Sequence, residues 1–286
     1  MSKGRQPLIP SELAKKAAQV GVTKRLMPLP LPTPSLETFR YWARIQFSTY
    51  SKCVGFIDTE DDQGNRGIGT CFHVGEGVFV TARHVVEGRR ILEVGFHDLS
   101  VTMELIQDFS RRDLGRPGAL QILEGPVFHP DARVDVACLR MDYVPKDFIP
   151  LGGHFDDYLG QYDLLLHRAL VLGYPSVPMT SEPVLVASLG EINALVTLRD
   201  RKHVHFLVSS MARGGFSGGP VLVAYDELNE KSGTALLGLV TDSLVRDDGQ
   251  LETGFMTVLS IEPVYDCLES NAMLPAVQRA SEESAV

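Results

Sequence analysis

The sequence predicts an all-β fold, built as a sandwich or as barrels, for most of its length. Short apolar runs of strand composition recur from about residue 47 onward, and turns rich in Gly, Asp and Asn separate them. The chain has 26 glycines and 17 prolines among 286 residues, which is typical of a protein with many turns. No long helical patterns alternate regularly with these runs, so a parallel α/β sheet is not expected.

The predicted strands follow one another closely. Residues 53–57 and 68–74 flank a turn-like segment and are expected to form a hairpin. The next run, 77–86, is an apolar strand that ends in a polar tripeptide carrying His84, and residues 134–141 place Asp135 at the start of an apolar strand. Further strands are predicted at 170–174, 184–190, 205–208, 221–224, 235–240 and 254–258, and a closing helix at 261–268.

The N-terminal part has a different composition. Residues 11–20 carry a helix start signal and good helix formers, and residues 27–34 alternate proline with apolar residues, which favours an extended spacer. A second helix, at 35–45, contains the only tryptophan, Trp42, and is expected to pack on the main body. We therefore divide the chain into a helical and Pro-rich extension (1–46), a body (47–270, with halves at roughly 47–150 and 151–270) and a polar C-terminal tail (271–286).

Composition and charge exclude several classes of function. A formal charge of -9 argues against a nucleic-acid-binding protein, which usually carries a basic face. Residues 1–20 lack the apolar core of a secretory signal, and no later run reaches the length of a membrane span. The four cysteines are widely separated, so buried free thiols in a reducing cytoplasm are expected. We predict a cytoplasmic protein with no nucleic-acid partner, no membrane contact, no cofactor and no metal.

The most informative stretch is 214–220, with the sequence GGFSGGP. Glycines on both sides of Ser217 permit a tight turn that exposes its hydroxyl and directs backbone N–H groups beside it, although most such clusters are ordinary turns. The presence of His84 and Asp135 favours the catalytic interpretation of this turn over an ordinary turn. An imidazole can take the serine proton near neutral pH, and a carboxylate on its other nitrogen fixes the tautomer. We predict a catalytic triad of His84, Asp135 and Ser217.

Three blocks in this order resemble the signature blocks of the trypsin-like serine proteases: 81–86 (TARHVV), 135–139 (DVACL) and 215–220 (GFSGGP). Without a disulfide framework, the chain is most similar to the bacterial HtrA/Deg-type and related cytoplasmic branches. The resemblance covers roughly residues 47–268 and implies two antiparallel β-barrels that meet at an active-site cleft. It also implies a serine endopeptidase with protein or peptide substrates, and a bacterial source.

The resemblance further implies roles for other residues. The backbone N–H groups of Gly215 and Ser217 would form the oxyanion hole. Residues 240–243 resemble the strand that pairs with the substrate backbone, and Thr241 is expected to hydrogen-bond Asp135. The residues expected at or near the primary specificity pocket are Met211, Asp242, Ser243, Gly254 and Met256.

The sequence also departs from the family pattern. Phe216 stands where secreted trypsins have the acid that pairs with a newly cut N-terminus, so zymogen cleavage is not expected. Met211 stands about where trypsin has its pocket acid, which favours an apolar residue before the scissile bond. Without a zymogen switch, we expect a regulatory layer that acts through residues 1–45 or a partner protein.

Other interpretations stay open from the sequence alone. The same fold used as a protein-binding scaffold in a stress or defence complex is the main alternative, and an esterase-like hydrolase is a third. His203 and His205 are two residues apart and would share one face of a strand. They could supply half of a metal site, but surface or packing roles are favoured.

Overall fold

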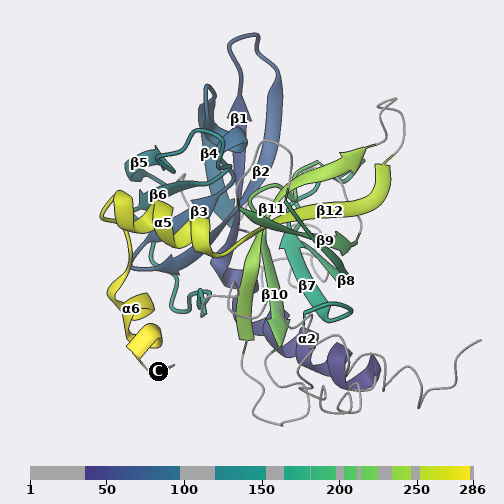
Figure 1. The fold of residues 1–286 in the computed structure, drawn as a ribbon. Coiled ribbons are helices and arrows are strands. Elements are labelled where there is room, and N and C mark those ends of the chain that lie inside the picture. The colour runs from purple at the N-terminus through teal and green to yellow at the C-terminus, as the bar shows by residue number, and fades with distance from the viewer. Residues whose placement is uncertain are drawn as a thin grey trace, which may run out of the picture.

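The computed structural model describes residues 36–96, 120–152, 164–180, 182–197, 203–210, 214–224, 234–245 and 252–283 (Figure 1). The predicted helix at 11–20, the proline-rich spacer at 27–34 and Met211 lie outside the described residues. Among the described helices, none combines the length and the apolar character that crossing a bilayer requires.

The first half of the body is a six-stranded antiparallel sheet with the order β4-β1-β2-β3-β6-β5. The predicted hairpin is confirmed, with Val54 opposite Phe72 and Glu60 opposite Arg66. The end strands β4 and β5 do not pair with each other within the described residues. The strands are β1 (Val54–Glu60), β2 (Arg66–Gly75), β3 (Val78–Thr81), β4 (Arg90–Phe96), β5 (Ile122–Phe128) and β6 (Ala137–Met141).

The second half is a closed antiparallel barrel with the order β10-β11-β12-β9-β8-β7. Closure pairs the first strand of this half, β7, with both β8 and β10. The predicted strands are present, and several extend beyond their expected ends. They are β7 (Arg168–Gly173), β8 (Val186–Thr197), β9 (Val204–Ser209), β10 (Pro220–Ala224), β11 (Thr234–Val245) and β12 (Glu252–Ser260). The prediction of an all-β, two-barrel fold is confirmed.

The two halves share one hydrophobic core, because a single cluster of buried side chains runs through both. Tyr174, which follows β7, is fully buried and donates a hydrogen bond from its hydroxyl to the Val54 carbonyl in β1 at 3.1 Å. Thr70 in β2 bonds to the backbone of Tyr174 and Gly215 in the second half. These hydrogen bonds fix the two halves to each other.

Helices pack around this β structure, with α2 near the ends of β7 and β10 and α5 against the first sheet (Figure 1). The predicted N-terminal helix is confirmed as α2 (Leu36–Tyr50), which buries Phe39, Trp42 and Ala43 in the core. Phe39 stacks on Trp42 with ring centroids 5.2 Å apart. The remaining helices are the 3-10 turn η1 (Ser51–Cys53), the one-turn α3 (Arg83–Val86), the closing helix α5 (Glu262–Ser270) and α6 (Ala276–Glu283).

The C-terminal segment differs from the expected polar tail, because residues 276–283 form α6 and the segment packs against the first sheet. Met273 and Leu274 are buried, and so is the polar Gln278. The Gln278 amide donates to the carbonyls of Val74 and Ile149, at 2.6 and 3.0 Å, and accepts from the Leu151 N–H at 3.0 Å. Hydrogen bonds to buried backbone groups thus dock a mostly polar segment.

Candidate active site

His84 lies on α3, the single helical turn that follows β3. Val78 to Thr81 are fully buried, so β3 fixes the place where the chain turns. Ala82 is extended, with φ -75° and ψ 140°, and the Glu87 N–H closes the turn on the Arg83 carbonyl at 2.8 Å. This change from strand to helix leaves the His84 side chain half exposed beside the cleft.

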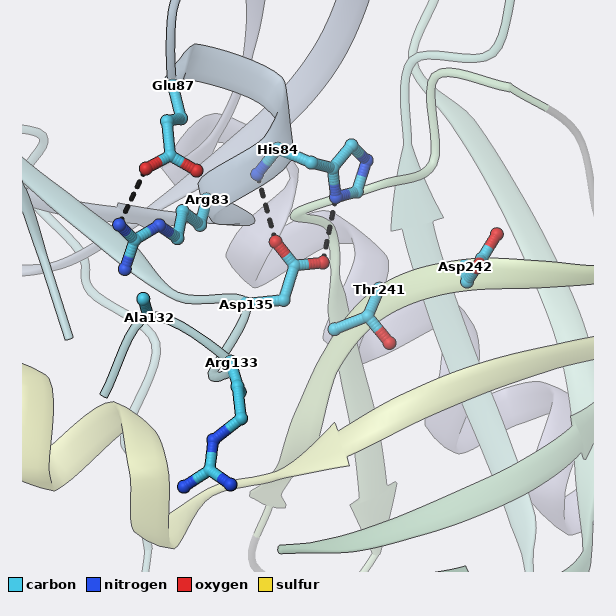
Figure 2. A pocket seen from close by; sticks show the side chains of 8 residues that line it. All are labelled: Arg83, His84, Glu87, Ala132, Arg133, Asp135, Thr241 and Asp242. Atoms are coloured by element: carbon cyan, nitrogen blue, oxygen red, sulfur yellow. Dashed lines mark hydrogen bonds and ion pairs between the residues drawn. The ribbon is translucent and has the colours of Figure 1, made fainter. Parts of the chain in front are cut away.

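Asp135 holds His84 by two groups at once. One carboxylate oxygen accepts from the backbone N–H of His84 at 2.9 Å, and the other lies 2.7 Å from Nδ1 of its ring. The Asp135 side chain is only 12% exposed, whereas that of His84 is 50% exposed. Because an ionised carboxylate only accepts hydrogen bonds, Nδ1 carries the proton and Nε2 of the neutral ring is left as a base. In Figure 2, Nε2 lies on the far side of the ring from Asp135.

The electrostatic environment of His84 favours its protonated form. Burial has the largest individual effect and lowers the pKa of His84. The hydrogen bond to Asp135 and the charges of Asp135 and Asp242 together outweigh it, so the pKa is raised above its ordinary value. An imidazolium formed during a reaction would therefore be stabilised where it forms.

Arg83 joins the segment that carries His84 to the segment that carries Asp135. Its guanidinium lies 4.8 Å above the Phe128 ring and donates to the His129 carbonyl at 3.4 Å. It also forms an ion pair with Glu87, at 2.6 Å, one turn further along the chain. The side chain is largely buried, so these contacts fix α3 against the loop between β5 and β6.

Ser217 lies in a glycine-rich turn that Thr70 holds in place. The Thr70 N–H donates to the Ser217 carbonyl at 2.9 Å, and its hydroxyl donates to the Gly215 carbonyl at 2.6 Å. The same hydroxyl accepts from the Tyr174 N–H at 2.9 Å, and Thr70 is fully buried. One threonine therefore fixes both residues predicted to bind a substrate carbonyl.

The glycines of this turn are required by close backbone packing. Gly215 has φ +102° and Gly218 has φ +83°, conformations that side chains with a Cβ resist. A Cβ on Gly218 would overlap the Thr70 carbonyl and would lie 2.8 Å from the Ala82 nitrogen. Ala82 is two residues before His84, so the serine turn packs directly on the segment that carries the histidine.

The Ser217 hydroxyl and the nearby N–H groups are not engaged by the described residues. No hydrogen bond joins Ser217 to His84 in this part of the chain. Within the same residues, the N–H groups of Gly215 and Ser217 have no acceptor, whereas the Gly218 N–H donates to the Val240 carbonyl at 2.7 Å. These two N–H groups of one turn are therefore left available for the oxyanion-hole role that the resemblance implies.

A cavity of about 530 Å³ opens next to His84 and Asp135 (Figure 2). Both halves of the body contribute to it, since α3 and the β5–β6 loop supply one wall and β11 supplies the other. Most of its lining is charged or polar. The lining residues are Arg83, His84, Glu87, Ala132, Arg133, Asp135, Thr241 and Asp242.

The structure places some of the predicted substrate residues at this cavity and not others. Thr241 and Asp242 line it, and Gly254 is exposed with open space where a side chain would begin. Met256 is 1% exposed in β12, opposite Ser243 of β11, so it belongs to the core of the barrel. Met256 is not among the described residues that line this cavity.

The expected hydrogen bond from Thr241 to Asp135 is not formed. The Thr241 hydroxyl instead lies 3.2 Å from that of Thr257 and points away from Asp135 (Figure 2). Thr257 belongs to the neighbouring strand β12, and both threonines are buried. The cross-strand partner is nearer for a buried hydroxyl, which must be satisfied.

Sequence reasoning missed four lining residues, Arg83, Glu87, Ala132 and Arg133. Arg83 adjoins the predicted base, and its four-residue spacing from Glu87 was a readable signal for an ion pair on one helical face. Arg133 forms a bidentate ion pair with Asp131, in which Nε donates to one carboxylate oxygen at 3.0 Å and Nη2 donates to the other at 2.6 Å. Nothing in the sequence showed that this loop would border the cavity.

The two-histidine segment does not form a metal site in the described residues. His205 is fully buried, with Nδ1 3.0 Å from the His203 carbonyl, and the His203 ring packs edge-on against that of His129. No group of three or more His, Cys, Asp or Glu side chains suited to a metal ion occurs in the described ranges. Both histidines make ring or backbone contacts in this part of the chain.

A closed β-barrel packs on a second antiparallel sheet, and a His–Asp pair and a serine flanked by glycines lie in this body, as expected for a peptidase of the trypsin-like class. Residues 69–228 match the family model of the trypsin-like peptidase domain. This match covers more than half of the chain, which therefore belongs to the trypsin-like peptidase family. No curated protein matched the sequence.

Solved structures agree with this fold. The Rv3671c protease of M. tuberculosis in its active form aligns with 86% of this chain and 91% of its own, at 17% identity and a TM-score of 0.55. The HtrA-type protease AlgW, with a tripeptide, aligns with 82% of this chain and 64% of its own, also at 17% and 0.55. A serine endoprotease from Yersinia pestis aligns with 85% of this chain and 68% of its own, at 16% identity and a TM-score of 0.51.

Proposed function

We propose that this chain is a serine endopeptidase in which Ser217 is the nucleophile, His84 the general base and acid, and Asp135 the residue that orients His84. The observation that carries the proposal is the double contact of Asp135 with the backbone N–H and Nδ1 of His84. It fixes the ring, its tautomer and the direction of its free nitrogen together.

The proposed reaction uses an acyl-enzyme. Ser217 Oγ attacks the peptide carbonyl while Nε2 of His84 takes its proton, and the resulting imidazolium returns that proton to the leaving amine. The N–H groups of Gly215 and Ser217 stabilise the oxyanion, and one such donor typically contributes about 2.7–4 kcal/mol. Water then hydrolyses the ester, with His84 as base again.

The missing hydrogen bond between Ser217 and His84 fits a site that completes itself on binding substrate. Catalytic hydrogen bonds are often long or misaligned in structures without substrate and tighten in the complex. The same observation favours the second candidate function, a trypsin-like fold used mainly as a protein-binding scaffold in a stress or defence complex. Catalysis is the first choice because the Asp135–His84 geometry has no role in a scaffold.

The proposed substrate is an extended peptide that lies along β11. β10 pairs with β11 only as far as Leu239, whereas β11 continues to Val245. Within the described residues, Thr241 to Ser243 therefore have no strand on that side, and a peptide can add there as a strand. Asp242 would contact substrate in the cavity, while Met211, Ser243, Gly254 and Met256 remain the proposed surroundings of the specificity pocket.

Cleavage of a peptide library derived from a digested proteome tests the endopeptidase proposal. The wild-type chain should cut internal bonds with a shared residue preference before the scissile bond, and Ser217→Ala should cut none of them. Trimming of peptide ends alone, or equal cleavage by Ser217→Ala, would contradict it. Binding of library peptides without cleavage by either protein would favour the scaffold.

We further propose that residues 1–45 or a protein partner regulate the site, and that the protein works in the bacterial cytoplasm without nucleic acid or membrane. The structure modifies the design of the test, since α2 contributes core residues and must be kept. A chain that lacks only residues 1–35 should differ from the full chain in cleavage rate or in partner capture. Unchanged cleavage and unchanged capture would contradict the regulatory role.

A further inference from the structure

Two cysteines that lie 129 positions apart in the sequence contact each other in the interior. Cys138 is the second residue of β6, and Cys267 lies in the middle of α5, which crosses the first sheet next to β6 (Figure 1). Their Sγ atoms are 3.1 Å apart, and both side chains are fully buried. Both cysteines are free thiols in this structure.

We propose that Cys138 and Cys267 form a redox modification site, at which oxidation creates an intramolecular disulfide that fixes α5 to β6. The geometry requires little movement, because a disulfide has an S–S distance of about 2.05 Å and the two sulfurs already face each other. The sulfurs need to approach by roughly 1 Å, which side-chain rotation and small shifts of the helix can supply.

The C-terminal end of α5 is already held in position for this bond. The side-chain amide of Asn271 donates to the Cys267 carbonyl at 2.8 Å and to the Phe128 carbonyl at 3.1 Å. Phe128 ends β5, and its neighbour Val127 lies opposite Cys138 in the sheet. Asn271 therefore ties the helix to the strand beside Cys138 independently of the sulfurs.

The other two cysteines provide an internal comparison. Cys53 and Cys71 are equally buried, but neither has a sulfur within contact distance. Burial raises the pKa of Cys53 to about 12 and also raises that of Cys71. A buried, isolated and protonated thiol reacts slowly and has no partner to form a disulfide, so oxidation should select Cys138 and Cys267.

The proposed oxidant is a peroxide, and the reaction balances with hydrogen peroxide. The thiolate of one cysteine attacks the peroxide oxygen and becomes a sulfenic acid, with release of one water. The second sulfur then attacks the sulfenic sulfur, forms the S–S bond and releases a second water. The two thiols lose two protons and two electrons, and the peroxide is reduced to two waters.

The reaction should be slow, because the first step requires a thiolate and solvent access. The hydrogen bond with Cys267, followed by burial, raises the pKa of Cys138. Oxidation therefore depends on transient opening of α5, and the bond then prevents that opening. β6 begins two residues after Asp135, so a helix locked on β6 also supports the strand next to this residue.

The test oxidises the full-length chain with hydrogen peroxide, denatures it, and labels the remaining thiols with a maleimide. Reduced protein should take four labels, one for each cysteine in the sequence, and oxidised protein should take two. Digestion should yield one cross-linked peptide pair that contains Cys138 and Cys267, and dithiothreitol should restore four labels. Cys138→Ala and Cys267→Ala should not give this pair, whereas the matched control Cys53→Ala/Cys71→Ala should.

Four results would overturn the proposal. Four labels after oxidation would show that the pair does not react, a bond that includes Cys53 or Cys71 would show the wrong partners, and a link between two chains would show that it is intermolecular. Oxidation of Cys138 to a sulfinic acid without a bond would also overturn it.

Thermal unfolding tests the locking role. The closed loop restricts the unfolded chain, so oxidised wild type should melt roughly 5–15 °C above the reduced form. Because both forms have the same sequence, folding defects of a variant do not enter this comparison. The Cys138→Ala/Cys267→Ala variant should melt at the same temperature with and without peroxide. A disulfide that forms without any rise in melting temperature would contradict the claim that it fixes α5 to β6.

Discussion

Thr70 shows how one buried side chain organises the proposed reaction centre. Its hydroxyl donates a hydrogen bond to the Gly215 carbonyl and accepts one from the Tyr174 N–H, while its own N–H donates to the Ser217 carbonyl. The residue lies 147 positions before the serine, so the turn is positioned by the first sheet and not by its own sequence. The glycines permit this conformation, and Thr70 selects it.

Thr70→Val should therefore impair the site more than its small change in volume suggests. It leaves two buried backbone groups without a partner and should lower the free energy of unfolding by about 1–3 kcal/mol. Displacement of the turn should slow peptide cleavage roughly 10- to 100-fold. The measurements are urea unfolding and kcat/KM.

Thr59→Val is the matched control, since Thr59 is also buried in the first sheet but bonds to the Gly67 carbonyl. It should lose stability without a comparable loss of cleavage. Equal loss of cleavage in the two variants would mean that Thr70 has no special relation to the serine turn.

Asp242 gives a prediction about pH. Its charge contributes to the raised pKa of His84, which must be neutral to accept the serine proton. Activity should therefore rise with pH through a pKa above the ordinary value of about 6.5. Asp242→Asn removes one of the charges that raise this pKa, so the acidic limb of kcat/KM should move to lower pH.

Asp62→Asn, in the exposed turn between β1 and β2, makes the same charge change away from the cavity and should leave the limb in place. Two outcomes would contradict the assignment of the acidic limb of kcat/KM to His84. The limb could move to higher pH in Asp242→Asn, or it could move equally in both variants.

For single residues, the sequence predicted which residue types form the site better than it predicted their contact partners. His84, Asp135 and Ser217 could be proposed as a triad because each stands at the edge of an apolar strand or in a glycine turn. The partner of Thr241 was predicted wrongly, since the cross-strand contact with Thr257 depends on the register of β11 and β12. Arg83 was overlooked because its role depends on Phe128, which lies 45 positions away.

Among the elements, α6 docks through a buried polar side chain, Gln278. Gln278 makes three hydrogen bonds to backbone groups of the first sheet and the segment that follows it. Gln278→Ala should leave these groups unsatisfied and lower the free energy of unfolding by at least about 2 kcal/mol. Arg279 is the exposed neighbour of Gln278, and Arg279→Ala should change the free energy of unfolding by less than about 0.5 kcal/mol.

Urea unfolding of both variants measures this difference. A Gln278→Ala protein as stable as Arg279→Ala would show that α6 docks without the glutamine. Proteolysis of the native proteins provides a second readout, because release of α6 should expose the segment after α5.

The strands and α2 could be predicted from sequence because their residues alternate or cluster by polarity in ways that depend on local structure. The packing of α6 could not. Its sequence, AVQRASEE, is mostly polar, and its anchor is a glutamine that finds its partners only in the folded protein. Burial by hydrogen bonding leaves no pattern in hydropathy.

For the whole molecule, the shared core makes the N-terminal helix part of the peptidase body. Deletion of residues 1–45 removes Phe39, Trp42 and Ala43, whereas deletion of residues 1–35 removes none of the three. Loss of a buried aromatic side chain typically costs about 3–5 kcal/mol. The longer deletion should therefore be several kcal/mol less stable than the shorter one.

Chemical denaturation of the two truncated proteins checks this expectation. Equal stabilities would contradict the assignment of α2 to the core. The all-β architecture itself was predictable from the spacing of short strands, but the shared core was not, because it depends on the contacts of Thr70 and Tyr174 between the halves.

The measurement that tests the central claim most directly is intact-mass analysis after incubation with a fluorophosphonate, which reacts with an activated serine. Wild type should gain a single adduct, mapped to Ser217, and the adduct should be absent in Ser217→Ala and in His84→Ala. Asp135→Asn should react more slowly than wild type, since it alters the His84 tautomer. An adduct at another serine, or equal labelling of wild type and His84→Ala, would contradict the triad.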